Sequence, residues 1–390
     1  MIFKSLYQSK FIYRQFHTSS PRHIHPLIWV FLKPALKGVA WITGRSTRKW
    51  YQQLPPEKRS VFAEHLNRHK YKYIGIFGTI GTACAIHYYT HLEASPITGR
   101  RRFMMMNAEH LTLMSDMEKE KIAKMFSDQM FPEHSKQTQL VARVARRIIG
   151  ANMDLDNIRN IKWTARVVDV DIKNAFVLPT GDIYVTRGLL ETLINEDQLA
   201  IILAHELSHA LLGHSAERLS YLQLIDMFGM SIFGAYIIWS IFPRDWISFV
   251  VNYIFENFIT FTSRLPYSRL LEEEADEVGL MLAAKACFDV REAVALWRVV
   301  HEAEMNAALP EFISTHPASA KRAETLNEKL PWALDIRRQC HCSPLPENKP
   351  PVSKLNISNN PNEKVMGILA KPIVSVHNIP VINVNKKEKQ

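Results

Sequence analysis

Hydrophobic and polar positions along the chain predict a mostly helical protein with one small sheet. Apolar residues recur at helical spacing through residues 105–165, 195–220 and 266–330. Residues 163–189 instead contain three short runs rich in β-branched residues, and the turn sequence Pro179-Thr180-Gly181-Asp182 separates the last two. We therefore expect an α+β fold whose strands form a β-hairpin or a three-stranded sheet.

Two uncharged apolar stretches are candidates for contact with a membrane. Residues 73–92 contain no Asp, Glu, Lys or Arg and carry tyrosines near both ends. Twenty helical residues rise about 30 Å, which matches the hydrocarbon core of a bilayer, so we predict a transmembrane helix there, with a buried soluble helix as the alternative. Residues 227–255 contain two shorter apolar runs, for which we predict a membrane-associated hydrophobic hairpin rather than a buried helical pair.

Charge is distributed unevenly along the 390 residues, which include 48 Lys and Arg against 38 Asp and Glu. Residues 1–25 are basic, contain no acid and mix aromatic residues with Ser and Thr, as in mitochondrial targeting peptides. A leader of this kind would place the basic segment 26–72 in the matrix and the chain after the span in the intermembrane space. We expect a catalytic domain at 105–332 and a polar tail at 333–390.

The helix expected at residues 195–220 carries candidate metal-binding and catalytic residues. His205 and His209 are one turn apart, so both rings lie on one face and can bind a single zinc ion. Glu206 lies beside them on the helix, close enough to take a proton from an attacking water. Two structural histidines on a buried helix are the alternative, but they do not explain the glutamate at this spacing.

A catalytic zinc site needs three protein ligands and an open position for water. The extended metzincin pattern is absent after His209, so the third ligand must come from elsewhere. Spacing alone does not choose among Glu272, Glu273 and Glu274, and a solvated acidic helix face is the alternative. Glu272 and Asp276 share a face, so one can bind zinc while the other accepts a hydrogen bond from a ligand histidine.

The segments HELSHALLGH, SRLLEEEADEVG and STHPASAKR together resemble the integral-membrane zinc peptidases that include HtpX and the CAAX prenyl proteases. The resemblance covers roughly residues 105–330. It implies a gluzincin-type zincin domain with one zinc per chain, Glu272 as third ligand and Asp276 behind the ligands. It also implies ATP-independent hydrolysis of peptide bonds in membrane proteins.

The resemblance implies roles for further residues. His316 would lie near the substrate carbonyl and stabilise the oxyanion, and Arg322 would lie on the substrate side. An edge strand would pair with extended substrate through main-chain groups, and its residues are Asn174, Ala175 and Phe176. His214 recurs in the motif as well, and we interpret it as structural.

With the leader and the span, the resemblance points to the mitochondrial inner-membrane members of the family, whose activity overlaps that of the m-AAA protease. It implies a single-pass protein whose catalytic domain faces the intermembrane space. Its role would be stress-responsive processing of the dynamin-like fusion GTPase and protein quality control. The partners would be inner-membrane protein substrates and the lipid bilayer. A homo-oligomer is a further possibility that the sequence leaves undecided.

The cysteines and two rival functions complete the expectations. Cys287 can pair with Cys340 or Cys342 in an oxidising compartment, with free thiols as the alternative. One rival is an HtpX-type or CAAX-type protease of another membrane. The other is a catalytically silent membrane adaptor that holds zinc only for folding. Nucleic acid is not an expected partner, because the chain lacks a basic, aromatic-rich patch outside the leader.

Overall fold

The computed structural model describes residues 46, 49–50, 53–224, 266–305, 316 and 320–347. These residues fall into two compact units: those up to residue 78 belong to the first, and those from residue 79 onward belong to the second. The second unit holds every candidate site residue. The predicted leader, the predicted hairpin at 227–255 and the chain from residue 348 onward lie outside the described residues.

The segment predicted to span a membrane is a helix, but not one that meets the requirements of a span. Helix α2 (Pro56–Arg68) precedes α3 (Lys70–Thr90). No helix in the described part of the chain combines the length and the hydropathy needed to cross a bilayer. The 21 residues of α3 include four tyrosines, three threonines and three glycines, which lower its mean hydropathy. The prediction of a helix is confirmed, whereas the prediction of a membrane span is not supported.

Two small sheets lie in the second unit. Strands β1 (Leu92–Ala94) and β2 (Arg101–Phe103) pair antiparallel. Strands β3 (Thr164–Val168), β4 (Ala175–Val177) and β5 (Asp182–Thr186) form a three-stranded sheet in the order β3-β5-β4. Strand β5 runs parallel to β3 and antiparallel to β4. The predicted small sheet is confirmed.

The turn between β4 and β5 requires glycine. Gly181 has φ +93°, a conformation that residues with a Cβ rarely adopt. A Cβ there would also lie 2.8 Å from the main-chain oxygen of Lys162. The turn places β4 at the edge of the sheet, next to the fully buried β5.

The helices of the second unit follow the predicted regions with shorter segments. In chain order, those with complete bounds are α4 (Ala108–Met125), α5 (Lys136–Ala151), α6 (Asp156–Arg159), α7 (Arg187–Thr192), α8 (Glu196–Leu212), α11 (Pro266–Lys285), α12 (Arg291–Met305) and α14 (Ala320–Gln339). Residues 214–224, after the turn at Gly213, are helical as well. The region 105–165, predicted to be helical, contains three helices and the first residues of β3. Pro132 and the N-cap Ser135 explain the break before α5. Helix α14 continues past residue 332, where we expected the domain to end.

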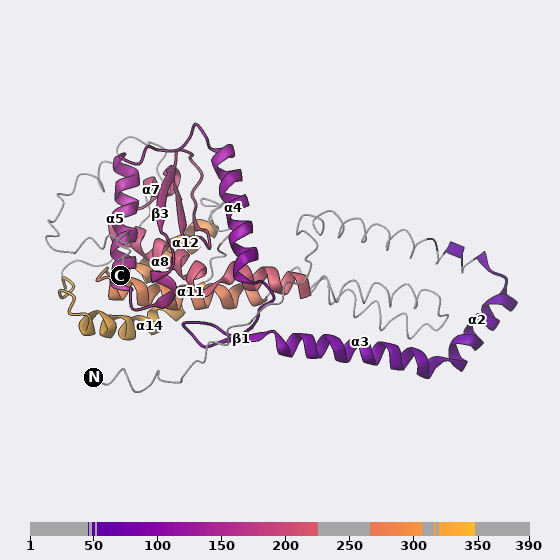
Figure 1. Cartoon of the computed structure of the whole chain (residues 1–390). Helices are drawn as coiled ribbons and strands as arrows, with labels where there is room; N and C mark the ends of the chain where they lie inside the picture. Colours follow the sequence, from indigo (N-terminus) through magenta and orange to yellow (C-terminus); the bar gives the residue numbers. More distant parts are fainter. Residues whose placement is uncertain are drawn as a thin grey trace, which may run out of the picture. The chain divides into compact units, whose positions relative to one another are not determined.

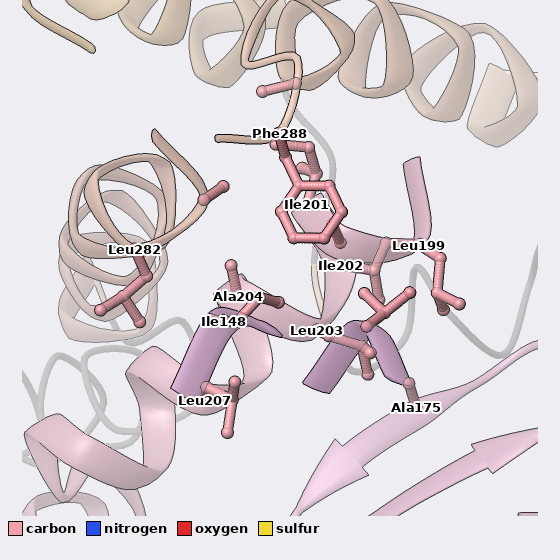
Figure 2. Packing of buried hydrophobic residues seen from close by; sticks show 14 of the residues in the cluster. Ile148, Ala175, Leu199, Ile201, Ile202, Leu203, Ala204, Leu207, Leu282 and Phe288 are labelled. Carbon is pink, nitrogen blue, oxygen red and sulfur yellow. The ribbon is translucent and has the colours of Figure 1, made fainter. Parts of the chain in front are cut away.

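The sheet lies between helices, as Figure 1 shows. Ile122 of α4 packs with Val168 and Tyr184 in a small cluster of buried residues. The main cluster lies among α5, α8, α11 and α12, with α8 at its centre (Figure 2). Thirteen of the 17 residues of α8 are buried, so the helix that carries His205 and His209 is held by packing on all sides.

The start of α8 is capped by two side chains. The Asn195 side chain accepts a hydrogen bond from the main-chain N–H of Gln198 at 2.7 Å. The Gln198 side chain in turn accepts one from the N–H of Ile194 at 2.9 Å. The helix ends at Gly213, whose φ of 68° is the left-handed conformation typical of a C-cap. Both ends are thus defined by local hydrogen bonds.

Candidate active site

The two histidines of α8 face one point in space. The Nε2 atoms of His205 and His209 lie 3.1 Å apart, as expected for rings one helical turn apart. Glu272 of α11 approaches the same point, with one carboxylate oxygen 3.3 Å from His205 Nε2 and the other 3.6 Å from His209 Nε2. Of the acidic run in α11, it is Glu272 that joins the histidines.

His316 lies in the same cluster. Its Nδ1 is 3.2 Å from Glu272 and 3.3 Å from His205 Nε2. Each of His205, His209, Glu272 and His316 offers one donor atom, and these atoms lie within 4.8 Å of one another. The neighbouring Pro317 of the predicted motif lies outside the described residues.

The close packing of α8 on α11 brings the cluster together. Gly279 lies on α11 opposite the main chain of His205, and a Cβ at Gly279 would be 3.0 Å from the His205 nitrogen. Any larger residue would push the helices apart. Gly279 follows Glu272 by seven positions and Asp276 by three, so all three share the face of α11 that meets α8.

A buried ion pair supports the cluster from behind. Asp276 Oδ1 lies 3.0 Å from Nδ1 of His205, close enough to orient the ring. Arg322 donates two hydrogen bonds to Asp276, each 2.8 Å long, and its Nη1 lies 3.1 Å from Glu272. Its guanidinium also stacks 3.5 Å from the ring centroid of Trp297. We expected Arg322 on the substrate side, but its 4% exposure and these contacts show that it holds the two carboxylates.

The electrostatics keep Glu272 and His209 in the protonation states that bind a metal. Burial by itself raises the pKa of Glu272, but contacts with His205 and His316 outweigh it and hold the pKa far below the usual value. Burial and the nearby charge of His205 lower the pKa of His209 well below 6.5. Metal ligands must be an ionised carboxylate and a neutral imidazole, so Glu272 and His209 are prepared to bind.

His205 and Glu206 respond differently to the same surroundings. Burial lowers the pKa of His205, but Asp276 and Glu272 outweigh that effect and raise it to about 9, so a metal must displace a proton there. Burial raises the pKa of Glu206. A carboxyl group with a raised pKa is suited to exchange protons with a substrate.

The residues fit a divalent metal ion. Two imidazoles and a carboxylate are a donor set that zinc prefers. Glu206 Oε1 is buried and forms no hydrogen bond with any residue that the structure describes, and His316 Nε2 is 3.3 Å away. A buried carboxylate oxygen that forms no hydrogen bond needs an explanation, and a water at the metal would supply one.

The predicted substrate strand lies at an open edge of the sheet. Ala175 and Phe176 belong to β4, which pairs only with β5 among the described strands. Asn174 precedes the strand, and its main-chain N–H donates to Thr186 Oγ1 at 2.9 Å. Strand β4 packs against α8, the helix that carries His205 and His209.

One disulfide forms, and it does not use Cys340. Cys287 bonds to Cys342, whereas Cys340 is exposed and free. His341 has φ 55°, so the chain turns sharply after α14 and brings Cys342 back toward the domain. Of the two pairings that the sequence left open, the structure has the one with Cys342.

Sequence reasoning missed two residues that shape the site. Gly279 had a readable signal, because it lies within a helical run on the same face as two acidic candidates. Trp297 had none, because an aromatic residue in an amphipathic helix is normally read as core. Its ring lies 5.7 Å from that of His205 and supports Arg322.

The sequence is similar to those of known peptidases. The model of peptidase family M48 matches residues 134–330. The bovine protein named "Metalloendopeptidase OMA1, mitochondrial" is 41% identical over 338 residues, which are 85% of this chain and 64% of the relative. The human protein of that name is 39% identical over 343 residues, 86% of this chain and 65% of the relative. The chain thus spans slightly less than two thirds of either protein.

A fungal relative is covered more completely. The Schizosaccharomyces pombe protein named "Mitochondrial metalloendopeptidase OMA1" is 34% identical over 269 residues. The match covers 68% of this chain and 75% of the relative.

Proposed function

Because the chain belongs to peptidase family M48, we propose that it is a mitochondrial zinc metalloendopeptidase that hydrolyses peptide bonds in other proteins. The observation that carries the proposal is the convergence of His205, His209 and Glu272 beside the buried carboxylate of Glu206. Three ligands and a neighbouring acid are what hydrolysis at a zinc ion requires.

We assign each residue a role in the reaction from its position in the site. His205, His209 and Glu272 would hold the zinc, and Asp276 would fix the His205 ring. Bound zinc supplies Lewis-acid polarisation of the scissile carbonyl and lowers the pKa of water. Glu206 takes the proton from the attacking water and passes it to the leaving amine. Its raised pKa suits both steps, because the group must accept and release a proton within one turnover.

His316 is proposed to stabilise the oxyanion. Its Nε2 lies 3.3 Å from Glu206, so the ring lies next to the group that activates water. An imidazole N–H there can donate to the negative oxygen that develops on the carbonyl.

Substrate is proposed to bind as an added strand. The outer edge of β4 offers main-chain donors and acceptors that pair with an extended peptide whatever its side chains. This mode suits a protease that acts on several proteins. Inner-membrane proteins, among them the dynamin-like fusion GTPase, are the substrates that we propose from the sequence resemblance.

The proposed location is the mitochondrial inner membrane, with the catalytic domain facing the intermembrane space. The names of the relatives support the mitochondrion. The Cys287–Cys342 bond supports an oxidising compartment, because reduced glutathione keeps thiols free in the matrix and cytosol. Protease protection of intact mitochondria and of mitoplasts tests the side on which the domain lies.

The test of the function compares wild type with Glu206→Gln in zinc content and in cleavage of inner-membrane proteins. We expect the variant to keep its zinc and to lose about 10²–10⁴-fold in cleavage rate. His205→Ala should lose the metal. Glu292→Gln is the matched control, because Glu292 is equally buried but contacts Asn195 at the start of α8. Normal cleavage by Glu206→Gln would overturn the proposal.

The second candidate function is a silent, zinc-holding adaptor, and one observation favours it. His316 offers a fourth donor within the cluster, and four protein ligands are typical of structural zinc sites. That function predicts that wild type binds zinc tightly, that His316→Ala binds zinc more weakly, and that neither protein cleaves substrate. The peptidase instead predicts that His316→Ala keeps zinc and cleaves slowly.

A further inference from the structure

A second chain of buried polar groups leads from His209 away from the metal cluster. The Nδ1 atoms of His209 and His214 lie 2.8 Å apart. Nε2 of His214 lies 3.3 Å from Oε2 of Glu274. His214 and Glu274 are both buried, and they join the end of α8 to α11. Glu274 is two positions from Glu272, so it projects from a different face of α11 and is free to serve this second contact.

One arrangement of hydrogens satisfies every member of the chain. Nε2 of His209 faces the cluster, so its Nδ1 carries the hydrogen and donates to Nδ1 of His214. Nε2 of His214 then carries a hydrogen and donates to the Glu274 carboxylate. Thr98 and Arg100 also donate hydrogen bonds to Glu274, so its carboxylate is the acceptor in each of these contacts.

The segment between β1 and β2 holds Glu274 in place. Thr98 donates its hydroxyl to one oxygen of Glu274, and Arg100 Nε donates to the other at 2.8 Å. The far end of Arg100 binds both oxygens of Glu217 at 2.8 and 2.7 Å. Glu217 is fully buried, so Arg100 is fixed at both ends.

We propose that His214 and Glu274, backed by Arg100, are positioning residues that hold the His209 ring in the tautomer and orientation needed to bind metal. They thereby set the metal affinity of the site. The proposal rests on the proposed function, since it requires His209 to be a ligand. The two ligand histidines would then be oriented differently, His205 by a carboxylate directly and His209 through a second histidine.

The test measures the zinc dissociation constant of the purified full-length protein by competition with a chromophoric chelator. Glu274→Gln and His214→Phe should each raise it about 10–100-fold, the usual effect of losing such a partner. The double variant should bind zinc no more weakly than His214→Phe alone, because the two residues act in series. An unchanged constant in both single variants, or fully additive losses, would overturn the proposal.

Two further measurements separate orientation from general damage. Asp182→Asn is the matched control, because Asp182 is a buried carboxylate of β5 with four hydrogen-bonding side chains of its own. It should lower the melting temperature and leave the zinc constant unchanged; an equal rise in that constant would overturn the proposal. Visible absorption of the cobalt-loaded protein reports ligand geometry, so a wild-type spectrum for Glu274→Gln would overturn it too.

The outcomes also distinguish this inference from the proposed function. If wild type binds no zinc, both are wrong. If wild type binds zinc and cleaves protein while the variants bind zinc equally well, only the inference is wrong.

Discussion

Replacing Arg322 with leucine should destabilise the metal-free protein far more than the zinc-loaded protein. The guanidinium is 4% exposed and donates two hydrogen bonds to Asp276, while its third nitrogen lies 3.1 Å from Glu272. Both carboxylates are buried, and Arg322 lies against each of them. Leucine would leave two neighbouring negative charges without that cation.

The magnitude follows from the burial of the pair. Removing one partner of a buried ion pair typically costs about 3–5 kcal/mol, because the remaining charge is uncompensated. Loss of the stacking contact with Trp297, at 3.5 Å, adds about 0.5–2 kcal/mol. We therefore expect Arg322→Leu to lower the free energy of unfolding of the metal-free protein by at least about 3 kcal/mol. Zinc would place a positive charge beside Glu272, so the loss should be smaller in its presence.

The assay is denaturant unfolding of wild type and variant, in chelator and in saturating zinc. Arg322→Lys keeps the charge but not the paired hydrogen bonds, so its stability should lie between those of wild type and Arg322→Leu. Arg298→Leu is the surface control, because Arg298 is exposed on the neighbouring α12, and it should change the stability by less than about 0.5 kcal/mol. A loss below about 1 kcal/mol in metal-free Arg322→Leu, or equal losses with and without zinc, would refute the reasoning.

Three other predictions concern the frame of the site. Gly279→Ala must separate α8 from α11 by a few tenths of an ångström, so the zinc dissociation constant should rise several-fold; an unchanged constant in a chelator competition would contradict this. Cys287→Ser opens a 55-residue loop and should cost up to about 4 kcal/mol under non-reducing conditions, whereas Cys340→Ser should leave the melting temperature unchanged. The pKa of Glu274 is lowered from 4.5 to about 2 in the folded protein, so its contribution to stability is present above pH 4.5 and lost toward pH 2. In Glu274→Gln the melting temperature should therefore depend less on pH across that range. Equal dependence in variant and wild type would refute the prediction.

Local geometry explains what could be predicted. His205, Glu206 and His209 were assigned correctly to one helix, because hydrogen bonding within a helix sets which residues share a face. The cap at Asn195 and the turn at Gly181 are likewise properties of a few adjacent residues. The membrane span was the exception, because an uncharged stretch can be long enough yet not apolar enough.

Contacts between segments that are distant in the sequence could be identified only in the folded structure. Spacing allowed three acidic residues as third ligand, and the packing of α8 on α11 across Gly279 brings Glu272 to the cluster. Arg322 turned out to bind Asp276, and Cys342 rather than Cys340 bonds to Cys287.

The sequence by itself determined the chemistry available on each helix: two imidazoles and an acid on one, a row of carboxylates on another. Only the tertiary structure decided which of these groups meet, because the energy that brings α8 and α11 together comes from the whole apolar core and not from the polar residues of the site. The His209–His214–Glu274 chain belongs to this second kind, since its members come from different elements and meet only when both are packed.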